Sequence, residues 1–138
     1  MHFFGAGNLA EAIIAGITRS NIVSNEQVLV TNRSDNTRLD LLSEKYGVQC
    51  NRNKEEMIQE ANIIILAMKP KDAGNYLNWL KDHIKPHHVV ISVIAGLSIE
   101  QMEKNAWRRY SCYSDDAKYI CINRPVSYCY FQGILRPA

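Results

Sequence analysis

A short glycine motif near the start of the chain has the clearest chemical meaning in the sequence. Residues 5–10 have the sequence GAGNLA, a G-x-G-x-x-A pattern. Gly5 allows a tight turn, Gly7 lets a phosphate approach the backbone, and Ala10 allows a helix to pack closely on a strand. The free N–H groups and the dipole of that helix would attract phosphates. The pattern predicts a nucleotide-binding turn, although a tight strand-to-helix turn without a ligand also fits it.

A second polar cluster bears on which nucleotide would bind. Enzymes that use NAD usually carry an acidic residue after the second strand, where it accepts hydrogen bonds from the ribose. This chain has Asn32, Arg33 and Ser34 at the corresponding place. These residues offer donors and a positive charge to a 2′-phosphate, which a carboxylate would repel. NADP(H) is therefore favoured and NAD(H) remains possible, since Asp35 follows closely and Arg33 could be an ordinary solvated loop residue.

Two more segments are expected at the same edge of the domain. Residues 67–70 (AMKP) and 93–96 (VIAG) each follow an apolar run. In an open α/β sheet, ligands bind at the carboxyl ends of the strands. Both segments are therefore candidates for the nucleotide site, although Lys69 could equally be a surface lysine.

The elements that must position these segments follow an alternating pattern up to about residue 104. Short β-rich runs alternate with amphipathic stretches, which is typical of a parallel sheet flanked by helices. Strands are expected at residues 3–4, 27–31, 48–50, 62–68 and 89–93, and helices at 8–19, from a cap at Ser34 to a stop at Gly47, at 54–60, at 73–84, and after a capping box of Ser98 and Gln101. The pattern predicts an α/β fold, a Rossmann-type doubly wound parallel sheet of about five strands.

The last part of the chain is different. Residues 105–138 contain five of the seven tyrosines and three of the four cysteines, with no clear helical or strand period. We divide the chain into a nucleotide-binding domain at residues 1–104 and an atypical, irregular tail at residues 105–138. From about residue 107 the tail is expected to be poorly ordered. It would then leave the strand at 89–93 as an open edge of the sheet.

Bulk properties exclude several classes of protein. The length of 138 residues is typical of one domain. The net charge of +2 is too small to indicate a nucleic-acid partner. No apolar run reaches membrane-spanning length, and the first residues lack the pattern of a secretory leader. The cysteine spacings match no zinc or redox pattern, so no metal site is expected. We expect a cytoplasmic protein with neither nucleic-acid nor membrane partners.

Four segments together resemble a known family. GAGNLAEAII, VTNRS, ILAMKPKD and VISVIAGLSIEQ occur in this order within residues 1–104. In sequence and spacing they resemble the cofactor domain of pyrroline-5-carboxylate reductase, with Leu9 where the family usually has methionine. The motifs and the resemblance together place the cofactor site at Gly5, Ala6, Gly7, Asn8, Leu9, Asn32, Arg33, Ser34, Ala67, Met68, Lys69, Pro70, Ala95 and Gly96.

The resemblance also implies a reaction. The family reduces a cyclic imine, pyrroline-5-carboxylate, to proline by hydride transfer from NAD(P)H. Ala95 and Gly96 would lie near the nicotinamide. In the family, a C-terminal helical domain completes the substrate pocket and forms the dimer. We expect that dimerisation domain to be absent from this chain, so no catalytic residue is assigned.

A change of reading frame would account for the tail. The family continues with a segment resembling R-x-M-P-N-T-P and then A-x-A-I-S, and neither is present. Back-translated and read one base later, residues 115–120 can encode Met-Met-Pro-Asn-Thr, and residues 127–132 can encode Ala-Thr-Ala-Ile-Ser-Lys. We interpret the tail as a frameshift product that begins near Asn105; a genuine extension is the alternative.

Three functions are therefore consistent with the sequence. The first is an NADPH-dependent imine reductase, and the second is a non-catalytic remnant that binds NADP(H). The third is another oxidoreductase with a similar N-terminal half, such as a hydroxyacid dehydrogenase of the 6-phosphogluconate type. The VTNRS and ILAMKPKD motifs argue against the third.

Overall fold

The strands form one mixed sheet with its parallel part first in the sequence. The computed structural model describes residues 1–97, 111–115 and 118–122. Within them the sheet has the order β3-β2-β1-β4-β5-β7-β6. The strands are β1 (His2–Phe4), β2 (Leu29–Thr31), β3 (Gln49–Cys50), β4 (Ile63–Leu66), β5 (Val89–Ser92), β6 (Ser111–Asp115) and β7 (Lys118–Ile122). The first five run parallel, which confirms the predicted doubly wound fold.

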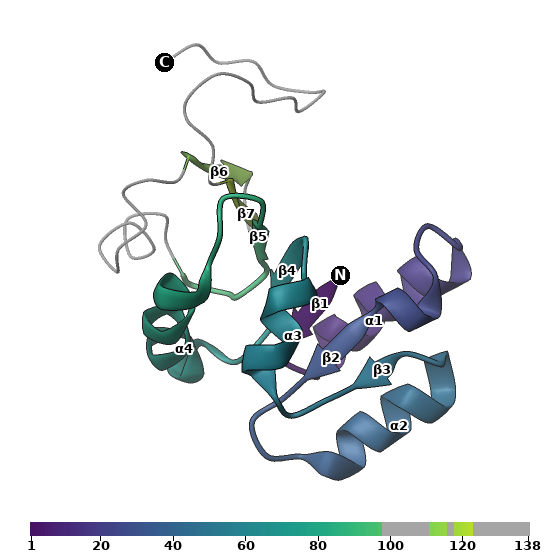
Figure 1. Ribbon diagram of the computed structural model, residues 1–138. Coiled ribbons are helices and arrows are strands. Elements are labelled where there is room, and N and C mark those ends of the chain that lie inside the picture. Colours follow the sequence, from purple (N-terminus) through teal and green to yellow (C-terminus); the bar gives the residue numbers. More distant parts are fainter. Residues whose placement is uncertain (98–110, 116–117, 123–138) are drawn as a thin grey trace.

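Helices connect the first five strands and cover both faces of the sheet (Figure 1). They are α1 (Asn8–Arg19), α2 (Asn36–Tyr46), α3 (Lys54–Glu60) and α4 (Pro70–His83), with a short 3₁₀ helix, η1 (Asn25–Gln27), before β2. None of the helices in the described ranges is both long and apolar enough to span a membrane.

Successive side chains along the strands point to opposite faces of the sheet and pack into two separate hydrophobic cores. Phe4 faces the side of α4, where it packs with Leu77 and other buried residues. Phe3 faces the side of α1 and α2 and packs with Ile14 and Leu42. The two faces of the sheet are therefore both buried, as the continuous apolar run of β4 predicts.

Two helix boundaries differ from those expected. The cap of α2 is Asp35 rather than Ser34, and its carboxylate accepts a hydrogen bond from the Arg38 N–H at 2.9 Å. Helix α4 begins at Pro70, three residues before the expected start, because proline has no N–H to lose in the first helical turn. The predicted stop of α2 at Gly47 is confirmed, since this residue adopts a left-handed conformation with φ of 66°.

The expectation of an open edge at β5 was wrong. Strand β7 pairs with β5 in antiparallel register, and β6 pairs with β7 beyond it. Two strands of the tail therefore cover an edge that would otherwise present unpaired backbone groups. The helix expected after Ser98 and the order of the rest of the tail lie outside the described residues.

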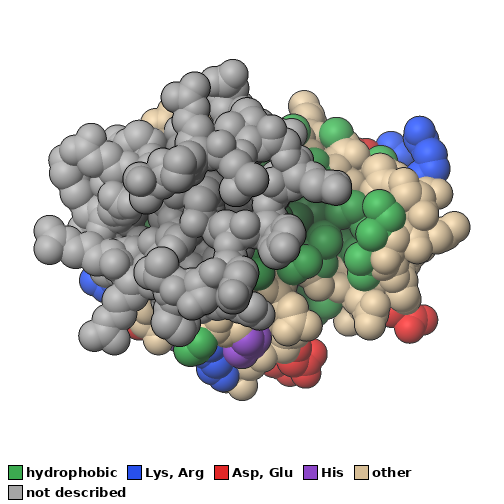
Figure 2. Space-filling view, turned by 90° about the horizontal axis from the view of Figure 1, so that it is seen from above, with side chains coloured by type: hydrophobic (Ala, Val, Ile, Leu, Met, Phe, Trp, Pro, Cys, Tyr) green, Lys and Arg blue, Asp and Glu red, His purple; other side chains and the backbone are tan. Residues whose placement is uncertain are grey.

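The glycine motif and the start of β1 lie at opposite ends of the parallel strands. Figure 2 looks onto the end of the sheet at which β1 begins, where hydrophobic side chains gather in one area of the surface. The glycine motif follows the opposite, carboxyl end of β1. The predicted nucleotide site thus belongs to the carboxyl end of the parallel strands.

Candidate nucleotide-binding site

The turn after β1 is fixed between the two neighbouring strands. Its first glycine, Gly5, has φ of +111°, a conformation that side chains disfavour. A Cβ at this position would lie 2.4 Å from the carbonyl oxygen of Ala67, directly after β4. On the other side the Gly5 N–H donates to the Thr31 carbonyl at 2.9 Å. Glycine is therefore required here by both conformation and space, as the motif predicts.

The second glycine lies at the entrance to α1 and faces open space. Gly7 is the N-cap of the helix, and a Cβ built on it would meet nothing within 4 Å. The first intrahelical bond of this turn runs from the Glu11 N–H to the Gly7 carbonyl at 3.0 Å. The N–H groups of Asn8, Leu9 and Ala10 precede it and have no partner within the helix. These features fit a phosphate group at the positive end of the helix dipole.

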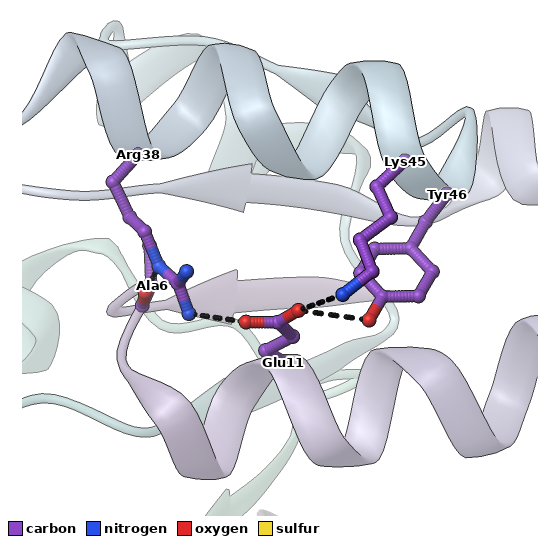
Figure 3. A network of polar contacts seen from close by, with 5 residues as sticks. All are labelled: Ala6, Glu11, Arg38, Lys45 and Tyr46. Carbon is purple, nitrogen blue, oxygen red and sulfur yellow. Dashed lines mark hydrogen bonds and ion pairs between the residues drawn. The ribbon is translucent and has the colours of Figure 1, made fainter.

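A network of charged side chains ties this turn to α2 (Figure 3). Arg38 donates through Nε to the Ala6 carbonyl at 2.8 Å and forms an ion pair with Glu11. Lys45 and the Tyr46 hydroxyl reach the other carboxylate oxygen of Glu11, at 2.9 and 2.8 Å. These three donors lower the pKa of Glu11 to about 2, and the hydrogen bond from Lys45 is the largest cause. The network holds the backbone of the glycine turn from the α2 side.

The loop after β2 presents the residues expected to select the nucleotide. Asn32 stabilises the loop through its side chain, which donates to the Asp35 carbonyl at 2.7 Å and accepts from the Asp35 N–H at 3.2 Å. Arg33 and Ser34 are exposed. The guanidinium of Arg33 extends to Asp72 in the first turn of α4, with an Nη1–Oδ1 distance of 3.0 Å.

The ends of β4 and β5 complete this edge. Ala67 and Met68 are half-buried, whereas Lys69 and Pro70 are exposed at the start of α4. Ala95 and Gly96 are exposed after β5, and Gly96 has φ of 76°. A cavity of about 280 Å³ lies between α4 and this segment, lined by Pro70, Ala73, Gly74, Leu77, Ile94, Gly96 and Leu97. The structure therefore brings the segments after β1, β2, β4 and β5 to one end of the sheet.

Sequence reasoning missed five charged or polar residues around this site. They are Glu11, Arg38, Lys45, Tyr46 and Asp72. Arg38 and Lys45 both lie on α2, seven residues apart and so on the same helical face, and that spacing could have indicated a shared partner. The identity of that partner, on another helix, is not given by any local pattern.

Fold and turn together define a Rossmann-type nucleotide-binding domain. A family model described as NADP oxidoreductase, coenzyme F420-dependent, matches residues 1–96. The chain belongs to this family.

Individual relatives agree with the predicted resemblance. The chain is 42% identical over 103 residues to pyrroline-5-carboxylate reductase 1 of Bacillus subtilis, which covers 75% of this chain and 35% of that protein. Its structure is similar to that of a pyrroline-5-carboxylate reductase from Coxiella burnetii, with a TM-score of 0.67, 31% identity, and 75% of this chain and 38% of the other covered. It is also similar to Plasmodium falciparum pyrroline carboxylate reductase with NADP bound, with a TM-score of 0.61, 28% identity, and 75% and 36% covered. The chain spans about a third of the length of the curated relatives it matches.

Proposed function

We propose that this chain binds NADP(H) at the carboxyl end of its parallel strands. The pyrophosphate would lie at the start of α1, within reach of the first N–H groups of the helix. The proposal rests on the two glycines of the turn. A side chain at Gly5 would collide with the backbone of Ala67, whereas Gly7 leaves open space in front of the helix. The proposed cofactor contacts are Gly5, Ala6, Gly7, Asn8 and Leu9 from the turn, Asn32, Arg33 and Ser34 after β2, Ala67, Met68, Lys69 and Pro70 after β4, and Ala95 and Gly96 after β5.

The preference for NADP(H) over NAD(H) rests on the loop after β2. Asn32, Arg33 and Ser34 carry no negative charge, and the side chain of Arg33 is 84% exposed. An exposed guanidinium can form charge-assisted hydrogen bonds to a 2′-phosphate, which NADH lacks. The Plasmodium relative was solved with NADP bound, which supports the same choice.

We further propose that residues 1–104 act as the cofactor domain of a pyrroline-5-carboxylate reductase. A bound NADPH would supply a hydride for the carbon of a protonated cyclic imine, which would give a secondary amine, proline. The contribution of this domain is to hold the cofactor in a fixed orientation, which lowers the barrier by positioning. The imine pocket and the dimer contacts are assigned to the part of the longer relatives that this chain does not match.

The proposal places the chain in the cytoplasm, where a free thiol such as that of Cys50 stays reduced. We also propose that a shift of the reading frame near Asn105 produced the tail at residues 105–138. Sequencing the gene tests this: the frame one base later should encode proline, asparagine and threonine in order over residues 115–120, and other residues there would contradict it.

Cofactor binding is tested by titrating the purified chain with NADPH and NADH and following nicotinamide fluorescence. We expect saturable binding of both, with NADPH the tighter. Arg33→Ala should weaken NADPH binding about tenfold while leaving NADH nearly unchanged, because one charged hydrogen-bonding partner of the phosphate is lost. Equal losses for both nucleotides would contradict the assignment of Arg33 to the 2′-phosphate.

Turnover distinguishes the reductase from the binding-only remnant. The chain is mixed with NADPH and pyrroline-5-carboxylate, and the nicotinamide absorbance is followed. Turnover by the chain alone would show that the matched third of the relatives suffices for catalysis. Binding without turnover would favour the remnant, with the imine pocket supplied by a segment outside the match.

A further inference from the structure

The ion pair between Arg33 and Asp72 crosses the end of the sheet at which the nucleotide is proposed to bind. Arg33 follows β2, and Asp72 lies in the first turn of α4, which follows β4. Strands β2 and β4 are the two neighbours of β1 in the sheet. The contact at 3.0 Å therefore spans the carboxyl end of β1, where the glycine turn begins.

The two partners differ in how firmly they are held. Asp72 is part of a helix, its N–H donates to the Lys69 carbonyl at 2.9 Å, and its side chain is 30% exposed. A carboxylate in the first turn of a helix is also stabilised by the helix dipole. Arg33 projects from a loop with 84% of its side chain exposed. Arg33 can therefore leave the pair at little cost, whereas Asp72 stays in place.

We propose that Asp72 is a specificity-determining residue that competes with the 2′-phosphate of NADP(H) for Arg33. This inference rests on the proposed binding of NADP(H). In the free protein the carboxylate of Asp72 occupies one end of the guanidinium. A 2′-phosphate must replace that contact, and its negative charge is also repelled by the carboxylate left behind. NADH carries no such phosphate and gains nothing from Arg33, so Asp72 narrows the preference for NADPH.

The size of the effect follows from the exposure of the pair. Exposed ion pairs contribute little because water and salt screen them. Replacing Asp72 should therefore tighten NADPH binding by only about two- to fivefold. The sign is the informative part, since removing a charged residue from a binding site more commonly weakens binding.

The test is a double-mutant cycle measured by fluorescence titration with NADPH and NADH. Its single variants are Asp72→Asn and Arg33→Ala, and the cycle is closed by their combination. We expect Asp72→Asn to tighten NADPH binding about two- to fivefold and to leave NADH unchanged. In the Arg33→Ala background the same substitution should tighten NADPH binding only slightly, because it removes the repulsion between the carboxylate and the phosphate and nothing more. Asp72→Ser serves as a second variant, because serine is also well tolerated at the start of a helix.

A truncated probe separates this inference from the rest of the site. Adenosine 2′,5′-bisphosphate carries the 2′-phosphate without the nicotinamide, and calorimetry should show the same gain for Asp72→Asn. Weaker NADPH binding by Asp72→Asn would overturn the inference and indicate that Asp72 orients Arg33. An equal gain with and without Arg33 would also overturn it, because Asp72 would then act by repulsion alone. NADPH binding that Asp72→Asn leaves unaltered would overturn it as well. No NADPH binding by the wild-type chain would instead refute the proposed function itself.

Discussion

The candidate nucleotide site has an inner half, which packs against neighbouring elements, and an outer half, which faces solvent. The inner half consists of Gly5, Ala6, Arg38 and the Arg38 partner Glu11. It is fixed by the close approach of Ala67 to Gly5 and by the hydrogen bond from Arg38 to the Ala6 carbonyl. The outer half consists of Gly7 and Arg33, which face open space and solvent.

Residue type alone does not define a role in this site. Arg33 and Arg38 lie five residues apart, yet one is 84% and the other 23% exposed. Arg38 shares its carboxylate partner with Lys45 and Tyr46, whereas Arg33 meets a carboxylate at a single contact. The inner half should therefore govern the stability of the turn, and the outer half should govern the affinity for nucleotide.

Gly5→Ala should have the largest effect. The new Cβ would lie 2.4 Å from the Ala67 carbonyl oxygen, and alanine disfavours φ of +111°. Overpacking and backbone strain together predict a loss of about 3 kcal/mol or more in the free energy of unfolding. Urea denaturation followed by circular dichroism measures it.

Gly7→Ala is the matched control for this change. Its Cβ meets nothing within 4 Å and its φ of −76° suits any residue. We expect stability close to that of the wild type and NADPH binding at least about tenfold weaker, because the methyl group occupies the space of the phosphate. A stable Gly5→Ala variant would remove the distinction between the two halves.

Arg38→Ala should have the next largest effect. It leaves the Ala6 carbonyl without its donor and removes one partner of Glu11. Hydrogen bonds to charged groups contribute about 1.5–3 kcal/mol, so a loss of about 2 kcal/mol in unfolding free energy is expected. Arg33→Ala, measured in the same way, should change stability by less than about 0.5 kcal/mol. Equal losses for the two arginines would show that exposure does not separate their roles.

The sequence predicts the turn well because its requirements are local. The spacing of Gly5, Gly7 and Ala10 specifies a strand-to-helix turn, and the structure has that turn between β1 and α1. The alternation of β-rich and amphipathic runs likewise predicts the five parallel strands. In these cases the determining interactions lie within a few residues of one another.

Interactions between distant segments could not be predicted in the same way. Glu11 meets its partners 27 to 35 residues away, and Arg33 meets Asp72 across 39 residues. The pairing of β7 with β5 was missed for a related reason. The tail has no hydrophobic period, whereas strands pair through backbone N–H and C=O groups, which every residue except proline carries.

The smallest expected effect is the response of the inner half to acid. The donors from Lys45, Tyr46 and Arg38 lower the pKa of Glu11 from its usual 4.5 to about 2. A lowered carboxylate pKa means that the folded state binds the proton less readily than the unfolded state. The contribution of Glu11 is therefore complete above pH 4.5 and is lost as the pH falls from 4.5 toward 2.

Glu11→Gln isolates this contribution from that of the buried His2. Burial lowers the pKa of His2 to about 4 in the folded state. Stability is therefore also lost between pH 6.5 and 4, where the unfolded state binds a proton at His2 and the folded state does not. That loss is common to the wild type and the variant, because Glu11 does not contribute to the pKa shift of His2 and forms its contacts with Arg38, Lys45 and Tyr46. We expect Tm of the wild type and Glu11→Gln to fall in parallel down to about pH 4.5 and then to converge, because only the wild type loses an ion pair there. Curves that stay parallel below pH 4.5 would show that the ion pairs of Glu11 do not stabilise the turn, and the inner half would then be fixed by Gly5 and by the hydrogen bond from Arg38 to the Ala6 carbonyl alone.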